Sequence, residues 1–102
     1  MSVYKIVTEK ELNVLKTTTK FDGTELDIRD GFIHMSKNME QVTYVINKYY
    51  KNIDDIYLLH IDPINLENLK FEESKSGDIF PHLYCALNIN NVIKIEKILL
   101  GI

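Results

Sequence analysis

Cysteine and arginine are almost absent from this sequence, which holds one of each, Cys85 and Arg29. A single cysteine excludes an intramolecular disulfide and a metal site built from several cysteines, and it favours a reducing compartment. The net charge is −3 and the lysines are scattered, so no cluster of positive charge predicts phosphate contacts with nucleic acid. We expect a cytoplasmic protein without a nucleic-acid partner.

Long apolar runs are missing as well. No stretch approaches the ~18 apolar residues that a membrane-spanning helix needs. The first residues, MSVYKIVTEKEL, reach a charge at Lys5 and lack the apolar run and cleavage site of a signal peptide. No long polar tract is present either, which argues against disorder. We therefore expect a soluble, folded chain without membrane contact.

The 102 residues that are present are 45% hydrophobic, and the apolar positions are spread along the whole chain. This is enough for one domain with one core of modest size. Apolar patterns predict strands at residues 3–7, 32–36, 55–62, 70–74, 79–87 and 91–99. Together with helices at 8–16 and 38–50, they predict an α+β fold with about two helices on a mixed or antiparallel sheet of five to six strands.

The first predicted helix begins with a capping signal. Thr8 and Glu11 have the spacing of a capping box, in which each side chain binds the backbone N–H of the other residue. Leu12 and Leu15 should lie on the buried side of this helix. The three threonines at 17–19 should end it, because β-branched polar residues weaken a helix.

The second predicted helix has Asn38 as its N-cap, with Gln41 three residues later. Between the helices, residues 20–31 contain two Asp-Gly pairs and are predicted to form a loop with a short strand. The nearly continuous apolar run at 55–62 predicts a central strand covered on both faces. The alternating pattern at 91–99 is typical of an outer strand.

Three histidines are the main candidates for chemistry, and none has the spacing of a metal site. His34, His60 and His82 lie far apart in the sequence, without a Cys or Glu pair at ligand spacing, so we predict no metal. His60 sits inside an apolar run. We expect it to be a core histidine bonded to the backbone or to Asp62.

His34 and His82 differ from His60 because each shares a strand face with aromatic and hydroxyl side chains. If the two faces met, they would form a pocket with apolar walls and a few directed polar groups, as in many small-molecule sites. For either histidine alone, a structural role in the core is an equally open alternative. The two faces are Phe32/His34/Ser36 and Phe80/His82/Tyr84.

Other signals for chemistry are weaker. The pattern of the first strand favours a Tyr4 ring that packs in the wall of the core over one that stacks on a ligand. Either Glu72 or Glu73 would face inward if 70–74 is a strand. Cys85 has no basic neighbour in the sequence that would lower its pKa, which disfavours a nucleophile. No phosphate-binding glycine loop, nucleophile elbow or paired-carboxylate signature is present.

Three motifs together resemble a known family. The sequence contains VYKIV near its start, DGFIHMS followed by Gln41-Val42, and FEESKSGDIFPHLYCAL near its end. They are similar to the YKI, DGFIHLS…QV and WEPSRGG…FPHLYGPL motifs of the family catalogued as domain of unknown function 952. The resemblance covers nearly the whole chain, with the motifs in the same order. It implies a fold like that of ADP-ribosyltransferases, which bind NAD between two small sheets.

The resemblance also implies roles for residues. The family's strand histidine falls on His34, which would bind a ribose hydroxyl, and Glu72 would be the carboxylate that steadies the reacting ribose electrostatically as nicotinamide leaves. These two are the candidate catalytic residues. An aromatic side chain, Tyr84 or Tyr4, would stack on the nicotinamide. The candidate ligand-binding residues are Tyr4, Phe32, Ser36, Gln41, Lys75, His82 and Tyr84.

The sequence departs from the family pattern within the third motif. Phe71 replaces the tryptophan, and Lys75 replaces an arginine and so loses the bidentate fork for phosphate or carboxylate. Ser76 and Cys85 add side chains where the family has glycine, and Glu73 replaces proline. These changes make the carboxylate end of the predicted site the least typical part.

Two functional hypotheses from different classes follow. The first is an enzyme that transfers an ADP-ribosyl group or consumes NAD, which would then be its cofactor or substrate. The second is a non-catalytic module that binds a nucleotide-like or other small molecule. A purely structural or interaction protein with core histidines is the third alternative. The chain could be a monomer or a homodimer, because its alternating last strand could pair with a second copy.

Overall fold

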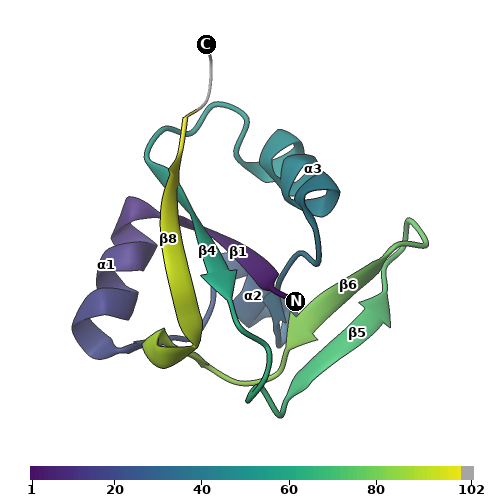
Figure 1. The fold of residues 1–102 in the computed structure, drawn as a ribbon. Coiled ribbons are helices and arrows are strands. Elements are labelled where there is room, and N and C mark those ends of the chain that lie inside the picture. Colours follow the sequence, from purple (N-terminus) through teal and green to yellow (C-terminus); the bar gives the residue numbers. More distant parts are fainter. Residues whose placement is uncertain (100–102) are drawn as a thin grey trace.

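Three small antiparallel sheets and three helices make up the fold of residues 1–99, which are the residues that the computed structural model describes (Figure 1). The helices are α1 (Glu9–Thr18), α2 (Glu25–Asp30) and α3 (Met39–Tyr49), with a short 3-10 helix, η1 (Ile89–Asn91). The sheets are β1 (Val3–Thr8), β4 (Ile56–Ile61) and β8 (Val92–Ile98); β2 (Lys20–Phe21) and β7 (Leu87–Asn88); and β3 (Ile33–His34), β6 (Ile79–Leu83) and β5 (Leu69–Glu73).

This architecture confirms the predicted α+β fold in a single domain. The described part of the chain differs from the prediction in detail, because it has three helices, eight strands and three sheets instead of about two helices, five to six strands and one or two sheets. All strand pairs are antiparallel. The additional strands are the two-residue β2, which lies in the segment where a short strand was predicted, and the two-residue β7, which begins at the end of the predicted strand 79–87.

The central sheet is covered on both faces. β4 lies between β1 and β8, as its apolar run predicted. On one face Leu59 and Ile61 pack with Leu15 of α1, and on the other face Leu58 packs with Val42 of α3. Figure 1 shows α1 and α3 on opposite sides of this sheet. The core therefore has two parts, separated by the sheet.

The predicted start of α1 is confirmed and its predicted end is wrong. Thr8 and Glu11 form the capping box, and Leu12 is buried. The helix continues through Thr18 instead of stopping before the threonines. It can do so because the Thr18 hydroxyl donates to the carbonyl oxygen of Val14 at 2.7 Å, which satisfies the polar side chain along the helix itself.

The segment at 20–31 is more ordered than predicted, because it contains the helix α2. Thr24 and Asp27 form a second capping box, and Gly31 ends the helix in the left-handed conformation at φ 87°. The spacing of Thr24 and Asp27 is the same as that of Thr8 and Glu11. The signal for this helix was thus present in the sequence between the two Asp-Gly pairs.

The strand β3 connects the β5–β6 hairpin to the rest of the fold. It pairs with β6, and the register sets Ile33 opposite Leu83 and His34 opposite His82. β6 in turn pairs with β5 in a hairpin, which Figure 1 shows extending to one side of the body. Ile33 and Leu83 are buried in the core, so the two histidines lie on the other face of this small sheet.

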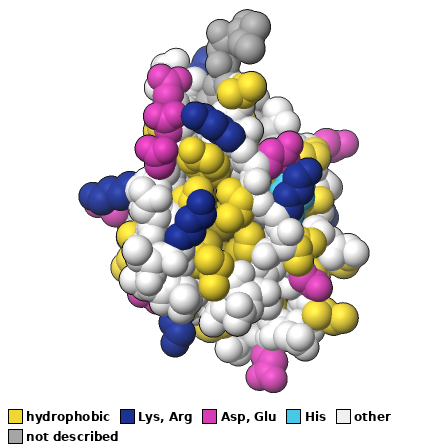
Figure 2. Space-filling model, turned by 60° about the vertical axis from the view of Figure 1, so that its left-hand side comes forward, with side chains coloured by type: hydrophobic (Ala, Val, Ile, Leu, Met, Phe, Trp, Pro, Cys, Tyr) yellow, Lys and Arg dark blue, Asp and Glu magenta, His cyan; other side chains and the backbone are white. Residues whose placement is uncertain are grey.

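β8 is the outer strand that the sequence predicted, at one edge of the central sheet. Its outer residues include the exposed Ile93 and Ile95. Figure 2 shows hydrophobic side chains gathered on this side of the molecule, with lysine or arginine side chains beside them. In the described residues, no helix has the length and apolar character needed to cross a membrane.

Candidate functional site

The strand faces that carry His34 and His82 lie side by side in the structure. The rings of His34 and His82 are 5.6 Å apart between centroids in an edge-to-face arrangement. Phe32 stacks on His82 with 4.0 Å between centroids and also contacts His34 at 4.5 Å. Tyr84 completes the cluster at 5.2 Å from Phe32. The condition stated for a pocket, that the two faces meet, therefore holds for these four residues.

A cleft of about 1020 Å³ opens beside this cluster. Both histidines line it, as do the candidate residues Tyr4, Ser36 and Lys75. Side chains from β1, α1, α2, α3, β6 and the turn between β5 and β6 contribute to its walls. Further aromatic, cationic and acidic side chains that line the cleft are Tyr44, Tyr49, Tyr50, Phe80, Lys10, Lys48, Glu11, Asp22, Glu25 and Asp30.

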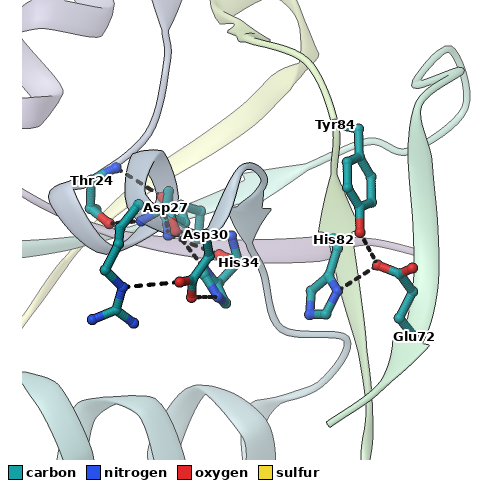
Figure 3. Close-up of polar contacts among 9 residues, drawn as sticks. Thr24, Asp27, Asp30, His34, Glu72, His82 and Tyr84 are labelled. Carbon is teal, nitrogen blue, oxygen red and sulfur yellow. Dashed lines mark hydrogen bonds and ion pairs between the residues drawn. The ribbon is translucent and has the colours of Figure 1, made fainter.

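His34 is held by carboxylates at both ring nitrogens (Figure 3). Asp27 Oδ1 is 2.6 Å from Nδ1 and also accepts from the backbone N–H of His34 at 3.0 Å. Asp30 Oδ2 is 3.1 Å from Nε2. Because an ionised carboxylate only accepts, the contact with Asp27 uses an N–H at Nδ1 of the ring. The helix α2, which carries both carboxylates, thus fixes the orientation of the imidazole.

Asp27 is the buried centre of this arrangement. Its side chain is 1% exposed and lies 2.9 Å from Lys5 Nζ, whose side chain is 7% exposed. Lys5 Nζ also donates to the carbonyl oxygen of His34 at 2.8 Å, and the backbone N–H of Thr24 donates to Asp27 at 2.9 Å. The carboxylate therefore accepts from every side, which is how buried charges are tolerated.

These contacts set the charge of the buried pair. Burial raises the pKa of Asp27, but the hydrogen bond from His34 and the charge of Lys5 lower it by more, so the pKa lies well below the ordinary aspartate range. Burial lowers the pKa of Lys5, against the opposing effect of Asp27. The site therefore contains an ionised aspartate beneath His34.

His82 is held in a parallel way from the other side. Glu72 Oε1 on β5 lies 2.8 Å from His82 Nδ1, and the Tyr84 hydroxyl donates to the same oxygen. These bonds from Tyr84 and His82 lower the pKa of Glu72, and the bond to Glu72 raises the pKa of Tyr84. Among residues 1–99, Nε2 of His82 has no protein partner. Figure 3 shows both imidazole rings directed to the same side.

Four candidate residues lie outside the lining of the cleft: Phe32, Gln41, Glu72 and Tyr84. Gln41 is buried and its amide both accepts and donates, because it accepts from the Lys37 N–H and donates to the Ile79 carbonyl oxygen. It ties α3 to β6. Glu72 contacts the cleft through His82, which makes it a positioning group in this geometry.

Tyr4 and Ser36 are joined through their backbones, each N–H donating to the carbonyl oxygen of the other at 2.8 Å. This bridge brings β1 beside the end of β3. The Tyr4 ring meets His60 edge to face, with 5.2 Å between centroids. The Tyr4 ring therefore packs against another side chain of the protein, as the sequence indicated, and Tyr4 also lines the cleft.

The expectation for His60 is wrong in its partner and its burial. His60 Nε2 lies 2.9 Å from Glu96 Oε1 on the neighbouring strand β8, and its side chain is 18% exposed. Asp62 instead accepts from the backbone N–H of Ile64. The register sets Glu96 opposite Leu58, so Glu96 is a diagonal neighbour of His60 on the same face of the sheet. This cross-strand register is not visible in the local sequence.

Sequence reasoning did not identify Lys5, Asp27 and Asp30 as site residues. One signal was available, because Lys5 alternates with Val3 and Val7 on a buried strand face and needs an acidic partner there. The second capping box marked Asp27. Within residues 1–99, no group of three or more His, Cys, Asp or Glu side chains is arranged to hold a metal ion.

The fold and site define a small α+β domain with two carboxylate-held histidines on paired strands above one cleft. The chain belongs to the family described as Protein of unknown function (DUF952), whose model matches residues 6–95. The family resemblance of the three motifs is therefore confirmed.

Solved structures support the same relationship. The chain is similar to the X-ray structure of protein CC0527 from Caulobacter crescentus, with 33% identity and a TM-score of 0.93 over 99% of this chain and 89% of that one. A solution NMR structure of CC0527 gives 34% identity and a TM-score of 0.81 over 94% and 83% of the two chains. The comparison with curated proteins gives no match.

Proposed function

We propose that the cleft binds a nucleotide-like ligand of the NAD or ADP-ribose class. The observation that carries this proposal is the pairing of His34 and His82, each fixed by a carboxylate, at the wall of a cleft of about 1020 Å³. A cleft of this size is at the upper end of those that hold small molecules and cofactors. The carboxylates fix the orientation of both imidazole rings toward the cleft, which a purely structural pair of histidines would not need.

The other walls suit the parts of such a ligand. Tyr4, Tyr44 and Phe80 offer aromatic surfaces for a base or a nicotinamide ring. Lys48 and Lys75 line the same cleft and could neutralise a pyrophosphate. His34 supplies a hydrogen bond for a ribose hydroxyl, and the hydroxyl of Ser36 adds a polar group two residues later, just beyond the end of β3.

The activity that we propose for this ligand is transfer of the ADP-ribosyl group from NAD. The bond between ribose C1′ and the nicotinamide nitrogen breaks, its electron pair leaves with nicotinamide, and an acceptor hydroxyl or water forms the new bond at C1′. His82, whose Nδ1 is held by Glu72, would take the acceptor proton on Nε2. Glu72 would then serve the reaction by orienting His82.

One observation favours the alternative of a non-catalytic binding module. Two of the three carboxylates at the histidines are already occupied, because Glu72 binds His82 and Tyr84 while Asp27 binds Lys5. Neither of these two is then free to steady a positively charged ribose in the way that glycosyl transfer requires. Binding and turnover are therefore measured separately.

Calorimetric titration of the purified protein with NAD, ADP-ribose and AMP tests binding. We expect saturable binding of NAD and ADP-ribose, lost in His34→Ala and His82→Ala and retained in His60→Ala, the matched control because His60 does not line the cleft. Ligand at a hundredfold excess over its Kd should also stabilise the fold by about 2.7 kcal/mol. No binding of any of the three would overturn the proposal.

Turnover is tested by following free nicotinamide during incubation with NAD. Release that disappears in His82→Ala supports the transferase, and binding without release supports the binding module. The setting that we propose is a cytoplasmic monomer or homodimer with a small-molecule ligand and without nucleic acid or membrane. The single cysteine and the scattered lysines of the sequence support it.

A further inference from the structure

At the edge of the cleft, a ring nitrogen of His34 lies beside a carboxylate oxygen of Asp30. Nε2 of His34 and Oδ2 of Asp30 are 3.1 Å apart, and each side chain is 31% exposed. Both residues line the cleft. The other polar atom of each side chain also has a partner. Asp27 binds Nδ1 of His34, and Arg29 Nε lies 3.0 Å from Oδ1 of Asp30.

The carboxylate of Asp30 is the acceptor of this pair. The hydrogen bond from Arg29 is the main cause of the lowered pKa of Asp30, so this aspartate is ionised near neutral pH. An ionised carboxylate has no proton to donate, so Asp30 can only accept a hydrogen bond. The edge of the cleft therefore presents a carboxylate acceptor 3.1 Å from a ring nitrogen of His34.

This pair matches the cis-diol of a ribose, whose adjacent hydroxyls can each donate and accept. One hydroxyl can donate to Asp30 Oδ2 while its neighbour forms a hydrogen bond with Nε2 of His34. An acidic side chain that binds ribose hydroxyls is how other dinucleotide sites select NAD over NADP. A 2′-phosphate would remove a donor and set negative charge against the carboxylate.

We infer that Asp30 is a specificity residue, which with His34 binds the free 2′ and 3′ hydroxyls of the adenosine ribose and excludes ligands with a 2′-phosphate. This inference rests on the proposed function, since it concerns the same cleft. It adds a specificity to that function, because the cleft should bind NAD and ADP-ribose more tightly than NADP.

Two observations assign the pair to the adenosine half of the ligand. Asp30 and His34 remain partly exposed, whereas a reacting ribose is better placed where water is excluded. Asp22 and Glu25 line the cleft from the same segment as Asp30, so this part of the wall is acidic. The lysines that suit a pyrophosphate, Lys48 and Lys75, come from α3 and from the turn between β5 and β6.

The test compares the Kd values of NAD and NADP by calorimetry in the full chain. The native protein should bind NAD at least about tenfold more tightly than NADP. Asp30→Asn keeps an oxygen acceptor and removes the charge, so NAD binding should be nearly retained while NADP binding improves and the ratio falls toward one. Asp30→Ala should weaken NAD binding and also reduce the ratio. Circular dichroism confirms that each variant is folded.

Glu73→Gln is the matched control, because Glu73 is exposed on β5 and lies outside the lining of the cleft. Its NAD to NADP ratio should equal that of the native protein. Equal affinity for NAD and NADP in the native protein, or a ratio that Asp30→Asn leaves unchanged, overturns the inference about Asp30 while the proposed function stands. Absence of binding by either dinucleotide overturns both.

Discussion

At the scale of single residues, the two carboxylates that hold His34 have different surroundings. Asp27 is buried with Lys5, while Asp30 is partly exposed and shared with Arg29. A buried charge depends on its partner, because removing one member leaves the other uncompensated in a low dielectric. A charge near water is compensated by solvent in any case. The first carboxylate should therefore matter for stability and the second for the ligand.

Asp27→Asn should lower the free energy of unfolding by about 3–5 kcal/mol, since it leaves the buried Lys5 charge without its partner. Urea denaturation followed by circular dichroism measures the loss. Asp30→Asn, the same change three residues later on the same helix, should cost far less. Equal losses in the two variants would show that the Lys5–Asp27 pair does not carry this stability.

The contact between Glu72 and His82 gives a second prediction at this scale. Glu72→Ala should change the protonation site and the orientation of the His82 ring, because Nδ1 loses its acceptor. Long-range proton–nitrogen NMR of the imidazole nitrogens reports this change directly. Glu73→Ala, at the exposed neighbouring position, should leave the signals of His82 as they are. The role of Glu72 as a positioning residue fails if both variants give the native spectrum.

At the scale of elements, the site depends on one short helix. α2 has six residues, carries both aspartates that hold His34, and is too short to be stable alone. Its capping box and the left-handed Gly31 fix its two ends. Gly23 precedes the helix at φ 121°, and a Cβ atom there would lie 2.6 Å from Cβ of Asp27. The turn before α2 can therefore hold only glycine without moving Asp27.

Gly23→Ala should destabilise the protein by about 2–5 kcal/mol, from left-handed strain together with a clash in a packed position. Gly77→Ala is the control, because Gly77 has a similar φ of 92° in the turn between β5 and β6 with open space around it. That variant should lose only about 1–2 kcal/mol. Urea denaturation of both measures the difference. Similar losses of unfolding free energy in the two variants would mean that the close approach of residue 23 to Asp27 does not contribute to the destabilisation.

Elements defined by local signals could be predicted from the sequence, and contacts between distant elements could not. α1 and α3 followed from the caps at Thr8 and Asn38. α2 has an equivalent cap at Thr24 but lies between two Asp-Gly pairs, which are typical of turns. His34 and His82 could be chosen because each shares a strand face with aromatic residues. Their pairing depends on long-range register, which no local pattern determines.

The same reasoning explains the missing partners of the site. Lys5 and Asp27 are far apart in the sequence, and each would be expected at the surface when considered alone. Only the packing of α2 against β1 brings them together. Glu72 was selected through the family resemblance, and the structure adds the bonds to His82 and Tyr84 that connect it to the site.

At the scale of the whole molecule, the three sheets depend on a few polar connections as well as on the core. The buried Lys5–Asp27 pair links β1 to α2, and Gln41 links α3 to β6. The hairpin of β5 and β6 has mostly exposed outer residues, so its position relies on the pairing with β3 and on these contacts. The charge state of the buried pair should consequently affect the stability of the entire fold.

The stability of the protein should therefore decrease in acid. The pKa of Asp27 is lower in the folded protein than its value of ~3.9 in an unfolded chain, so the unfolded state binds more protons as the pH falls. The stabilising contribution is complete above about pH 5 and is lost progressively as the pH falls through ~3.9 toward the lower folded pKa. Urea denaturation at pH 7, 5, 4 and 3 measures this dependence.

Asp27→Asn isolates the cause, because asparagine does not titrate. Other carboxylates with lowered pKa values, Asp30, Glu72 and Glu96, are partly or fully exposed and remain in this variant. The variant should start from a lower stability at pH 7 and lose distinctly less than the native protein between pH 5 and pH 3. A parallel decrease in both proteins would assign the acid sensitivity to the exposed carboxylates instead, and the buried pair would then have little influence on the fold as a whole.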